Sequence, residues 1–472
     1  MMDYLFIALT AAVIGFCFRG PQWGMAALAF TLPLSGRLPS LPIPLLNSQN
    51  LVVLAGLMAL MMRSRSEGRA GTIRFLAPLI LFLLLLTLAF ANTMLVFEPI
   101  RYAFAYKPYD VILGYKAVLT CVLLYVMGCL VARTREDIVF ALKGLMLGAA
   151  FEGAFVCLEV VMRGPARANG HLSEGNSAGA YLAGSFAAGL ALFLLQGFRS
   201  RWGQFSLATS AASGIGLLFT MSRGNWVAGI LGGGGVALLR DRRALVLLVL
   251  GLMAYPLWLP QKAMDRIDES FIDEKQQGWR FTTKQDTDEA ASITGLQNRL
   301  MGEEGAENRM RLDSSSQVRL YVWQAGMKMI QDYPLGVGYG VFPFYLHLYS
   351  DVIRFRAAHN SYLLLAAELG IPALIVFLVF LGLILFESLR AYTQVADPLM
   401  RGLALAAFGS TIAMMVSAVF YNFFFHVEVN GQQWLLAGLA TQIRLLPAIA
   451  PEAVTAPATA SGEPVPLYRM VT

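Results

Sequence analysis

The feature that most limits how this chain can fold is a series of apolar blocks, each about as long as a membrane-crossing helix. A hydrocarbon core about 30 Å thick takes roughly 20 helical residues to cross. Only helices and closed barrels span lipid, because they pair all of their backbone polar groups. The sequence has none of the alternating ten-residue segments of a barrel, so it predicts an all-α polytopic membrane protein.

Charged residues make up only 14% of the chain, against about 25% in ordinary globular domains, which excludes a soluble domain. The first apolar block has no basic front and no Ala-x-Ala cleavage site, so we expect a retained helix and not a signal peptide. We expect about 12–13 transmembrane helices, at approximately residues 3–18, 22–36, 50–62, 73–91, 110–132, 137–161, 176–198, 204–221, 224–239, 244–259, 360–387, 401–422 and 432–447.

This pattern divides the chain into four parts. Residues 1–260 are predicted to form an N-terminal transmembrane bundle of about ten helices, residues 261–358 a large polar loop, and residues 359–448 the C-terminal transmembrane helices. The last part, 449–472, is rich in Pro, Ala, Thr and Ser and is predicted to be a disordered cytoplasmic tail.

Lysine and arginine gather in alternate loops, and the side rich in them normally stays cytoplasmic. This places the large loop on the outer face of the membrane. The net charge of +6 follows from the same bias, so no nucleic-acid partner is expected. The basic loops contain Arg63, Arg65, Arg69, Arg74, Arg133, Arg135, Lys143, Arg199, Arg201, Arg240, Arg242, Arg243, Arg390 and Arg401.

The first part of the large loop, residues 265–312, is a charged insert with few large apolar residues. Such a composition buries little area, so we expect a solvated segment. Asp286-Thr287-Asp288 looks like the metal-binding DxD of soluble nucleotide-sugar transferases. A solvated charge run is the favoured interpretation, because nucleotide sugars are cytoplasmic and this loop is predicted to lie outside.

The second part of the loop is predicted to be an interfacial helix over residues 316–332. Its apolar residues recur at helical spacing, and Trp323 suits the outer membrane interface. Arg319 falls close to the predicted start, where the helix dipole disfavours a cation. This suggests an anionic ligand, although a snorkelling or salt-bridged arginine remains an alternative.

Glycines occur at two informative places. Gly336, Gly338 and Gly340 follow the predicted interfacial helix, where they either aim backbone amides at a phosphate or form a plain turn back to the membrane. Gly232–Gly235 lie inside a predicted span, where small residues indicate close helix packing.

A set of short motifs appears in a fixed order along this map. Ser222-Arg223-Gly224 comes first, and Arg319 with Trp323 follows in the loop. Then come 332–340 (DYPLGVGYG), 357–362 (AAHNSY) and 368–370 (ELG). In this order they resemble the O-antigen ligase and Wzy-type O-antigen polymerase family, integral membrane enzymes that transfer glycans from a polyprenyl-diphosphate carrier. The resemblance covers roughly residues 170–390.

The reaction of that family poses two problems. Negative charge builds on the departing diphosphate, and arginine suits it because its fork pairs bidentately with phosphate. The acceptor hydroxyl must also lose a proton, for which histidine titrates in the right range. The resemblance implies that Arg223 and Arg319 bind the diphosphate and that His359 is the general base. It also implies a GT-C-like fold and a metal-independent, inverting displacement with no cofactor.

Further substrate contacts are expected from Asn360 beside His359, from Asn176 at the start of a span, and from Trp323. None of the histidines (His171, His347, His359 and His426) has a neighbour at metal-ligand spacing, so no metal site is predicted. Glu152 and Glu159 share one helical face and could line a cavity or pair with arginines. Glu368 is not expected to face His359.

The predicted partners are an undecaprenyl-diphosphate-linked oligosaccharide as donor, a glycan, a lipid A core or a protein as acceptor, membrane lipid, and a chain-length regulator. The alternative is a polytopic transporter or a lipid-linked glycan flippase. Transporters usually show internal repeats and broken midplane helices, and the sequence has no evident repeat. A membrane scaffold would explain neither Arg223 nor the order of Arg319 and His359.

Overall fold

The structure, a computed structural model, describes residues 2–37, 48–67, 72–98, 105–164, 167–172, 174–254, 264, 271–272, 311–312, 314–350 and 355–446. The charged insert at 265–312, apart from residues 271–272 and 311–312, and the predicted tail at 449–472 lie outside these ranges.

The regular structure of the N-terminal half is helical among its described residues, and each predicted span of this half overlaps at least one helix. The elements are α1 (Met2–Arg19), α2 (Pro21–Thr31), η1 (a 3₁₀ helix, Leu32–Arg37), α3 (Ser48–Glu67), α4 (Leu76–Leu95), α5 (Pro108–Val131), α6 (Arg135–Arg163), α7 (Gly175–Gln196), α8 (Arg201–Phe219), α9 (Arg223–Arg240) and α10 (Arg242–Met253).

The C-terminal half begins with two short antiparallel strands, in which Phe271 pairs with Leu312 and Ile272 with Arg311. Helices make up the rest of its regular structure. The elements are β1 (Phe271–Ile272), β2 (Arg311–Leu312), α14 (Ser314–Asp332), α15 (Phe342–Tyr345), η4 (Leu346–Leu348), α16 (Ser361–Leu369), α17 (Ile371–Gln394), α18 (Pro398–Phe420), α19 (Val427–Gln442) and η5 (Ile443–Leu445).

The chain is therefore an all-helical polytopic protein, as predicted. Among the described residues, six helices are long and apolar enough to cross a membrane: α4, α5, α6, α7, α17 and α18. The other predicted spans are also helical, but they are shorter or less apolar than these six. The predicted span at 360–387 is two helices, α16 and α17, because Gly370 adopts a φ of 91° between them.

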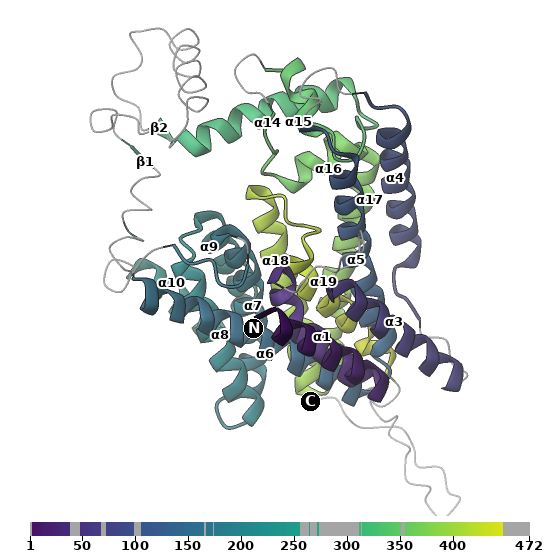
Figure 1. Cartoon of the computed structure of the whole chain (residues 1–472). Coiled ribbons are helices and arrows are strands. Elements are labelled where there is room, and N and C mark those ends of the chain that lie inside the picture. Colours follow the sequence, from purple (N-terminus) through teal and green to yellow (C-terminus); the bar gives the residue numbers. More distant parts are fainter. Residues whose placement is uncertain are drawn as a thin grey trace, which may run out of the picture.

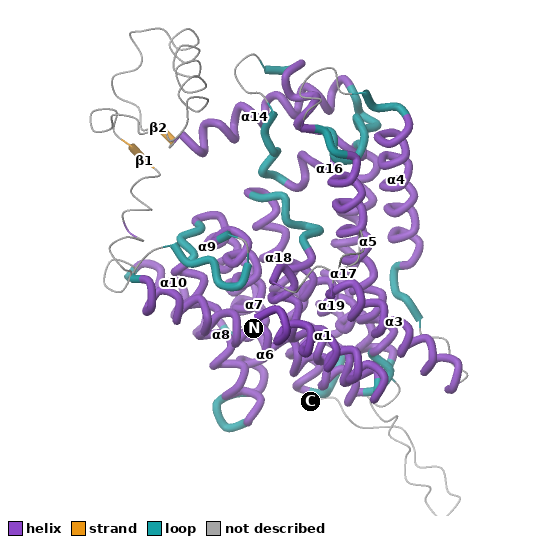
Figure 2. Tube along the Cα trace, in the orientation of Figure 1, coloured by secondary structure: helices purple, strands orange, loops and turns teal. Residues whose placement is uncertain are grey.

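Figure 1 shows α14 lying across one end of the molecule, above α16, with the C-terminus near the opposite end. We call the end that carries α14 and α16 the loop end. In the tube view several loops lie at the same end, around α14 and α16 (Figure 2). The predicted interfacial helix is α14, but its Val322, Ala325 and Met329 are buried against the protein. This face of α14 packs on the protein, whereas Met327 of the predicted apolar stripe is exposed.

Small residues hold the centre of the bundle together. The hydroxyl of Ser410 in α18 donates to the carbonyl of Gly184 in α7 over 2.9 Å. A Cβ at Gly232 of α9 would lie 2.7 Å from the carbonyl oxygen of Gly409. Such contacts let helix backbones approach closely. The interpretation of the Gly232–Gly235 run as a packing surface is confirmed.

Charged side chains at the end opposite α14 are paired. Arg63 binds Asp137 at 3.0 Å and Arg135 binds Asp397 at 2.5 Å. Glu387 accepts from two further arginines, Arg74 at 2.8 Å and Arg444 at 2.9 Å. These four arginines are held by carboxylates.

Candidate functional site at the loop end

His359 lies in the turn that leads into α16, with its backbone in the left-handed region at a φ of 47°. Its side chain is exposed at one side. The atoms packed around the rest of the ring, together with the positive charges of Arg319 and Arg356, lower the pKa of His359 below its usual value. The imidazole is therefore predominantly neutral at pH 7, which is the form that accepts a proton.

Asn360 fixes this turn to the start of α16. Its side-chain oxygen accepts from the amides of Tyr362 and Leu363, both over 3.0 Å, in the usual manner of an N-cap. Its own N–H donates to the side-chain oxygen of Asn422 over 2.9 Å. Asn360 was predicted to contact substrate, and the structure gives its side chain a capping role that orients the residue before it.

Trp323 supports the same turn from α14. Its indole N–H donates to the carbonyl of Ala358 over 3.0 Å. This bond ties α14 to the residue directly before His359. Trp323 was also predicted to contact substrate, and its hydrogen bond makes it a support for the histidine turn.

Arg319 projects from α14 toward the turn at residues 421–426. Its guanidinium carbon lies 5.5 Å from the centre of the Tyr421 ring, within cation–π range. Because α14 begins at Ser314, Arg319 lies in the second helical turn and not in the first. The helix dipole falls off within the first turn, so it is a weaker argument for an anionic ligand here than the sequence suggested.

Tyr421 joins Arg319 to the Ser222-Arg223-Gly224 motif. The hydroxyls of Tyr421 and Ser222 are 2.9 Å apart. Ser222 gives its one proton to the side-chain oxygen of Asn176 over 3.1 Å, so Tyr421 is the donor to Ser222. Arg223 follows Ser222 as the first residue of α9 and is half-buried. The predicted residues Asn176 and Arg319 are thus linked through Ser222 and a tyrosine that the sequence did not single out, and Arg223 is the chain neighbour of Ser222.

Arg167 is a further cation of this network that the sequence analysis missed. Its guanidinium binds the side-chain oxygen of Asn176 and donates to the carbonyl of Thr220, the latter over 3.1 Å. We refer to Arg167, Asn176, Ser222, Arg223, Arg319 and Tyr421 together as the arginine cluster.

Two buried carboxylates of α6 hold the loop from which Arg167 projects. Glu159 accepts the amides of Asn169 and Gly170 over 3.0 and 2.8 Å. Glu152 accepts a hydrogen bond from the backbone amide of His171 over 2.9 Å, and the ring nitrogen Nδ1 of His171 lies 2.8 Å from the other carboxylate oxygen. The acids therefore shape the loop next to the arginine cluster, and Glu159 also pairs with Arg163 at 2.6 Å. The seven-residue spacing of the acids was the signal that could have pointed to this loop.

The glycine-rich segment after α14 is used for docking. The amides of Val337 and Gly338 donate to the carbonyls of Ala367 and Glu368 over 2.9 and 3.0 Å. A Cβ at Gly336 would lie 2.5 Å from the carbonyl oxygen of Glu368. These amides are occupied by α16, which favours the turn interpretation over phosphate binding. The segment locks α14 to α16 and so fixes Arg319 relative to His359.

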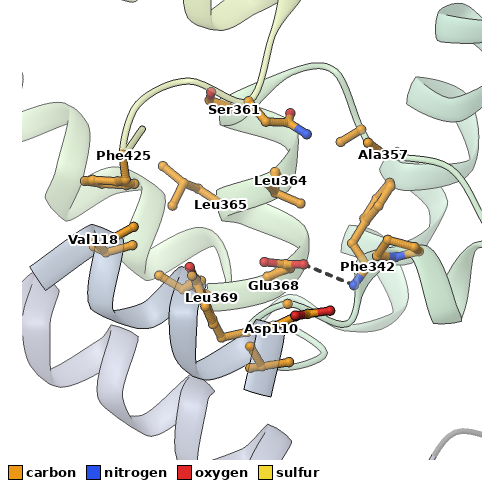
Figure 3. A pocket seen from close by; sticks show the side chains of 18 of the residues that line it. Asp110, Val118, Phe342, Ala357, Ser361, Leu364, Leu365, Glu368, Leu369 and Phe425 are labelled. Atoms are coloured by element: carbon orange, nitrogen blue, oxygen red, sulfur yellow. Dashed lines mark hydrogen bonds between the residues drawn. The ribbon is translucent and has the colours of Figure 1, made fainter. Parts of the chain in front are cut away.

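A cavity of about 410 Å³ opens beside the histidine turn, between one face of α5 and one face of α16. Figure 3 shows Glu368 among its lining side chains, with a hydrogen bond to the amide of Phe342, which is 3.1 Å long. Glu368 is buried, and the amide of Gly340 also bonds to its side chain. Ala357, Ala358 and Ser361, on either side of His359, also line the cavity.

Among the described residues, no group of three or more His, Cys, Asp or Glu side chains is arranged to hold a metal ion. The chain was compared with models of known families. Residues 208–378 match the family model of the Wzy_C domain, described as O-antigen ligase. The match runs from α8 into α17, and so contains Arg223, Arg319, His359 and Glu368. No protein of curated function matches the chain.

Proposed function

We propose that this chain, a membrane protein of the O-antigen ligase (Wzy_C) family and thus a glycan-transferring enzyme, moves an oligosaccharide from undecaprenyl diphosphate to an acceptor hydroxyl. The observation that carries the proposal is the convergence of Arg319 and the Ser222-Arg223 motif on Tyr421, beside His359. A diphosphate needs cations, and an acceptor hydroxyl needs a base, and this arrangement supplies both.

The proposed reaction is a single displacement. Arg223 and Arg319 bind the diphosphate oxygens, where charge develops as the donor bond breaks. His359 takes the proton of the acceptor hydroxyl, whose oxygen then attacks the anomeric carbon. The electron pair of the old carbon–oxygen bond leaves with the diphosphate, and the sugar inverts. Arginines supply the charge stabilisation in this scheme, so the proposed reaction is metal-independent.

The arginine cluster extends the predicted donor site by two residues. Arg167 contacts the same asparagine as Ser222, and this contact supports a role for it next to a diphosphate bound beside Asn176. Tyr421 orders the cluster through its ring and its hydroxyl. Its position supports a role as the residue that holds Arg319 in place.

We infer that the site faces the periplasm of a bacterial inner membrane. The arginines of the opposite end belong to loops that the charge asymmetry predicts to be cytoplasmic. In intact cells carrying an otherwise Cys-free variant, a membrane-impermeant thiol reagent should label a cysteine at position 278 and should not label one at position 69. The reverse pattern would overturn the orientation and with it the periplasmic site.

The function is tested by reconstituting the purified protein with an undecaprenyl-diphosphate-linked oligosaccharide and a panel of acceptors: lipid A core, lipid-linked glycan, and protein. We expect release of undecaprenyl diphosphate in step with the extension of one acceptor. Glycan acceptors would make the protein a polymerase, for which a chain-length regulator is a partner, and lipid A core would make it a ligase. Movement of the donor between leaflets with no release would instead establish a flippase.

A further inference from the structure

The cavity beside His359 is built from two helical faces. Its α5 residues recur every three or four positions, and so do its α16 residues, which is the spacing of a single helix face. The α5 residues are Asp110, Val111, Gly114, Ala117 and Val118, with Lys107 as the cap residue just before the helix, and the α16 residues are Ser361, Leu364, Leu365, Glu368 and Leu369.

The cavity is polar and exposed at one end and apolar and buried at the other. Lys107 and Asp110, at the start of α5, are exposed, whereas Val118 and Leu86 are buried. Lys107 and Val118 are eleven residues apart, or about 16 Å along a helix. In Figure 3 Val118 and Phe425 lie together, across the cavity from Phe342 and Ala357. A space of this shape fits an amphiphile with a polar head and an apolar chain.

The cavity and the arginine cluster lie on opposite sides of one stretch of backbone. Tyr421 has extended dihedral angles, with φ −149° and ψ 162°, and successive side chains of extended backbone point in opposite directions. The side chain of Tyr421 points to Ser222 and Arg319. The side chain of Asn422 lines the cavity and accepts a hydrogen bond from the backbone amide of Asn360. The histidine turn therefore lies between the two, since the charge of Arg319 acts on His359 while Ala358 and Ser361 line the cavity.

This placement decides which substrate the cavity suits. In an inverting displacement the nucleophile attacks from the side opposite to the leaving group. The donor's apolar chain is attached to its diphosphate and follows it to the arginine cluster. We propose that the cavity binds the other substrate, an acceptor glycolipid, with its apolar chain between α5 and α16 and its sugar toward His359. This proposal rests on the proposed function.

Glu368 gives the cavity a polar group for the sugar. A carboxylate offers about four lone-pair positions, and the amides of Phe342 and Gly340 take part of this capacity. The lone-pair positions that these amides leave open face the cavity, where they accept a hydrogen bond from a ligand hydroxyl. A sugar offers several hydroxyls in a fixed arrangement, whereas a simple alcohol offers one, so Glu368 favours a glycolipid.

The test is photolabelling of the full-length protein in lipid nanodiscs with three probes. The first is a single-chain alkyl glycoside with a diazirine at the chain end, the second the same chain as a free alcohol, and the third a diazirine-bearing polyprenyl diphosphate. We expect the glycoside to label the buried end of the cavity, at Val118 and Leu369, and the other two probes to label other sites. The readout is binding, so it is independent of whether glycan transfer is detected.

Three variants make the result specific. Ala117→Phe fills the cavity and should lower glycoside labelling about tenfold, whereas Leu119→Phe, on an exposed position of the same helix, should leave it unchanged. Leu364→Trp blocks the cavity from α16, the opposite wall, and replaces Ala117→Phe in the test if that variant does not fold. Glu368→Gln keeps an oxygen for the Phe342 amide but should weaken glycoside labelling about tenfold, the worth of one hydrogen bond to a charged group.

Each other result overturns the proposal. Labelling of the cavity by the polyprenyl diphosphate would assign it to the donor chain. Equal labelling by the alcohol would mean that the cavity binds lipid chains without recognising a sugar. If no probe labels Val118 or Leu369, the acceptor binds elsewhere, as expected for a protein acceptor. Failure of donor release in the transfer assay, with glycoside labelling intact, would count against the proposed function alone.

Discussion

Replacing His359 with alanine is expected to slow glycan transfer about 10²–10⁴-fold, the usual contribution of a general base. Donor binding should change little, because the diphosphate is assigned to the arginine cluster. The wild-type rate should fall as the pH falls through the lowered pKa of His359, since the protonated ring no longer accepts a proton. That acidic limb should be missing from the variant.

The measurement is single-turnover transfer from a purified lipid-linked donor, over roughly pH 5.5–8.5, about one unit or more on either side of the usual histidine value. His347→Ala is the matched control, because the ring of His347 bonds to the carbonyl of Phe344 over 2.7 Å and belongs neither to the cluster nor to the cavity lining. If His359→Ala transfers glycan within about threefold of the wild-type rate, the base is another group.

Replacing Arg319 with alanine is expected to slow transfer about 10²–10³-fold, as removal of one preorganised donor at a site of developing charge does elsewhere. Arg319→Lys keeps the charge, but it loses the planar fork and the contact of the guanidinium with the Tyr421 ring. We therefore expect the lysine variant to fall between the alanine variant and the wild type, with normal expression in both.

Arg163→Lys is the control for this series, because Arg163 is also near the loop end but is exposed and paired with Glu159 at 2.6 Å. It should transfer at close to the wild-type rate. The assay is donor turnover at saturating acceptor, with expression checked by quantitative blotting. Full activity in both Arg319 variants would mean that the diphosphate is bound without this residue.

The helices were predictable because long apolar blocks are a local property of the sequence. The break at Gly370 was missed because apolar residues continue on both sides of it, although Gly370 and Pro372 are both common at helix boundaries. Local pattern therefore located the membrane helices but not the separation of α16 from α17.

The candidate site was predictable only in part, for a related reason. The order of Arg223, Arg319 and His359 along the chain pointed to one face of the protein. Tyr421 and Arg167 could not be found in this way, because their significance lies in contacts with residues far away in sequence. Tyr421 meets Ser222 across 199 positions, and such a contact leaves no trace in the periodicity of either segment.

The glycine-rich segment crosses the chain at the start of α17, and this close contact limits which mutations can restore a damaged variant. A Cβ at Gly336 would meet the backbone near Glu368, and a Cβ at Gly370 would meet the backbone of Leu335, each at 2.5 Å. A clash between two side chains can be relieved by making the partner smaller. Here the partner is main chain, which no substitution shortens. Selection for recovery of a Gly370→Ala variant should therefore return true revertants, and no second-site suppressor among the residues that face it.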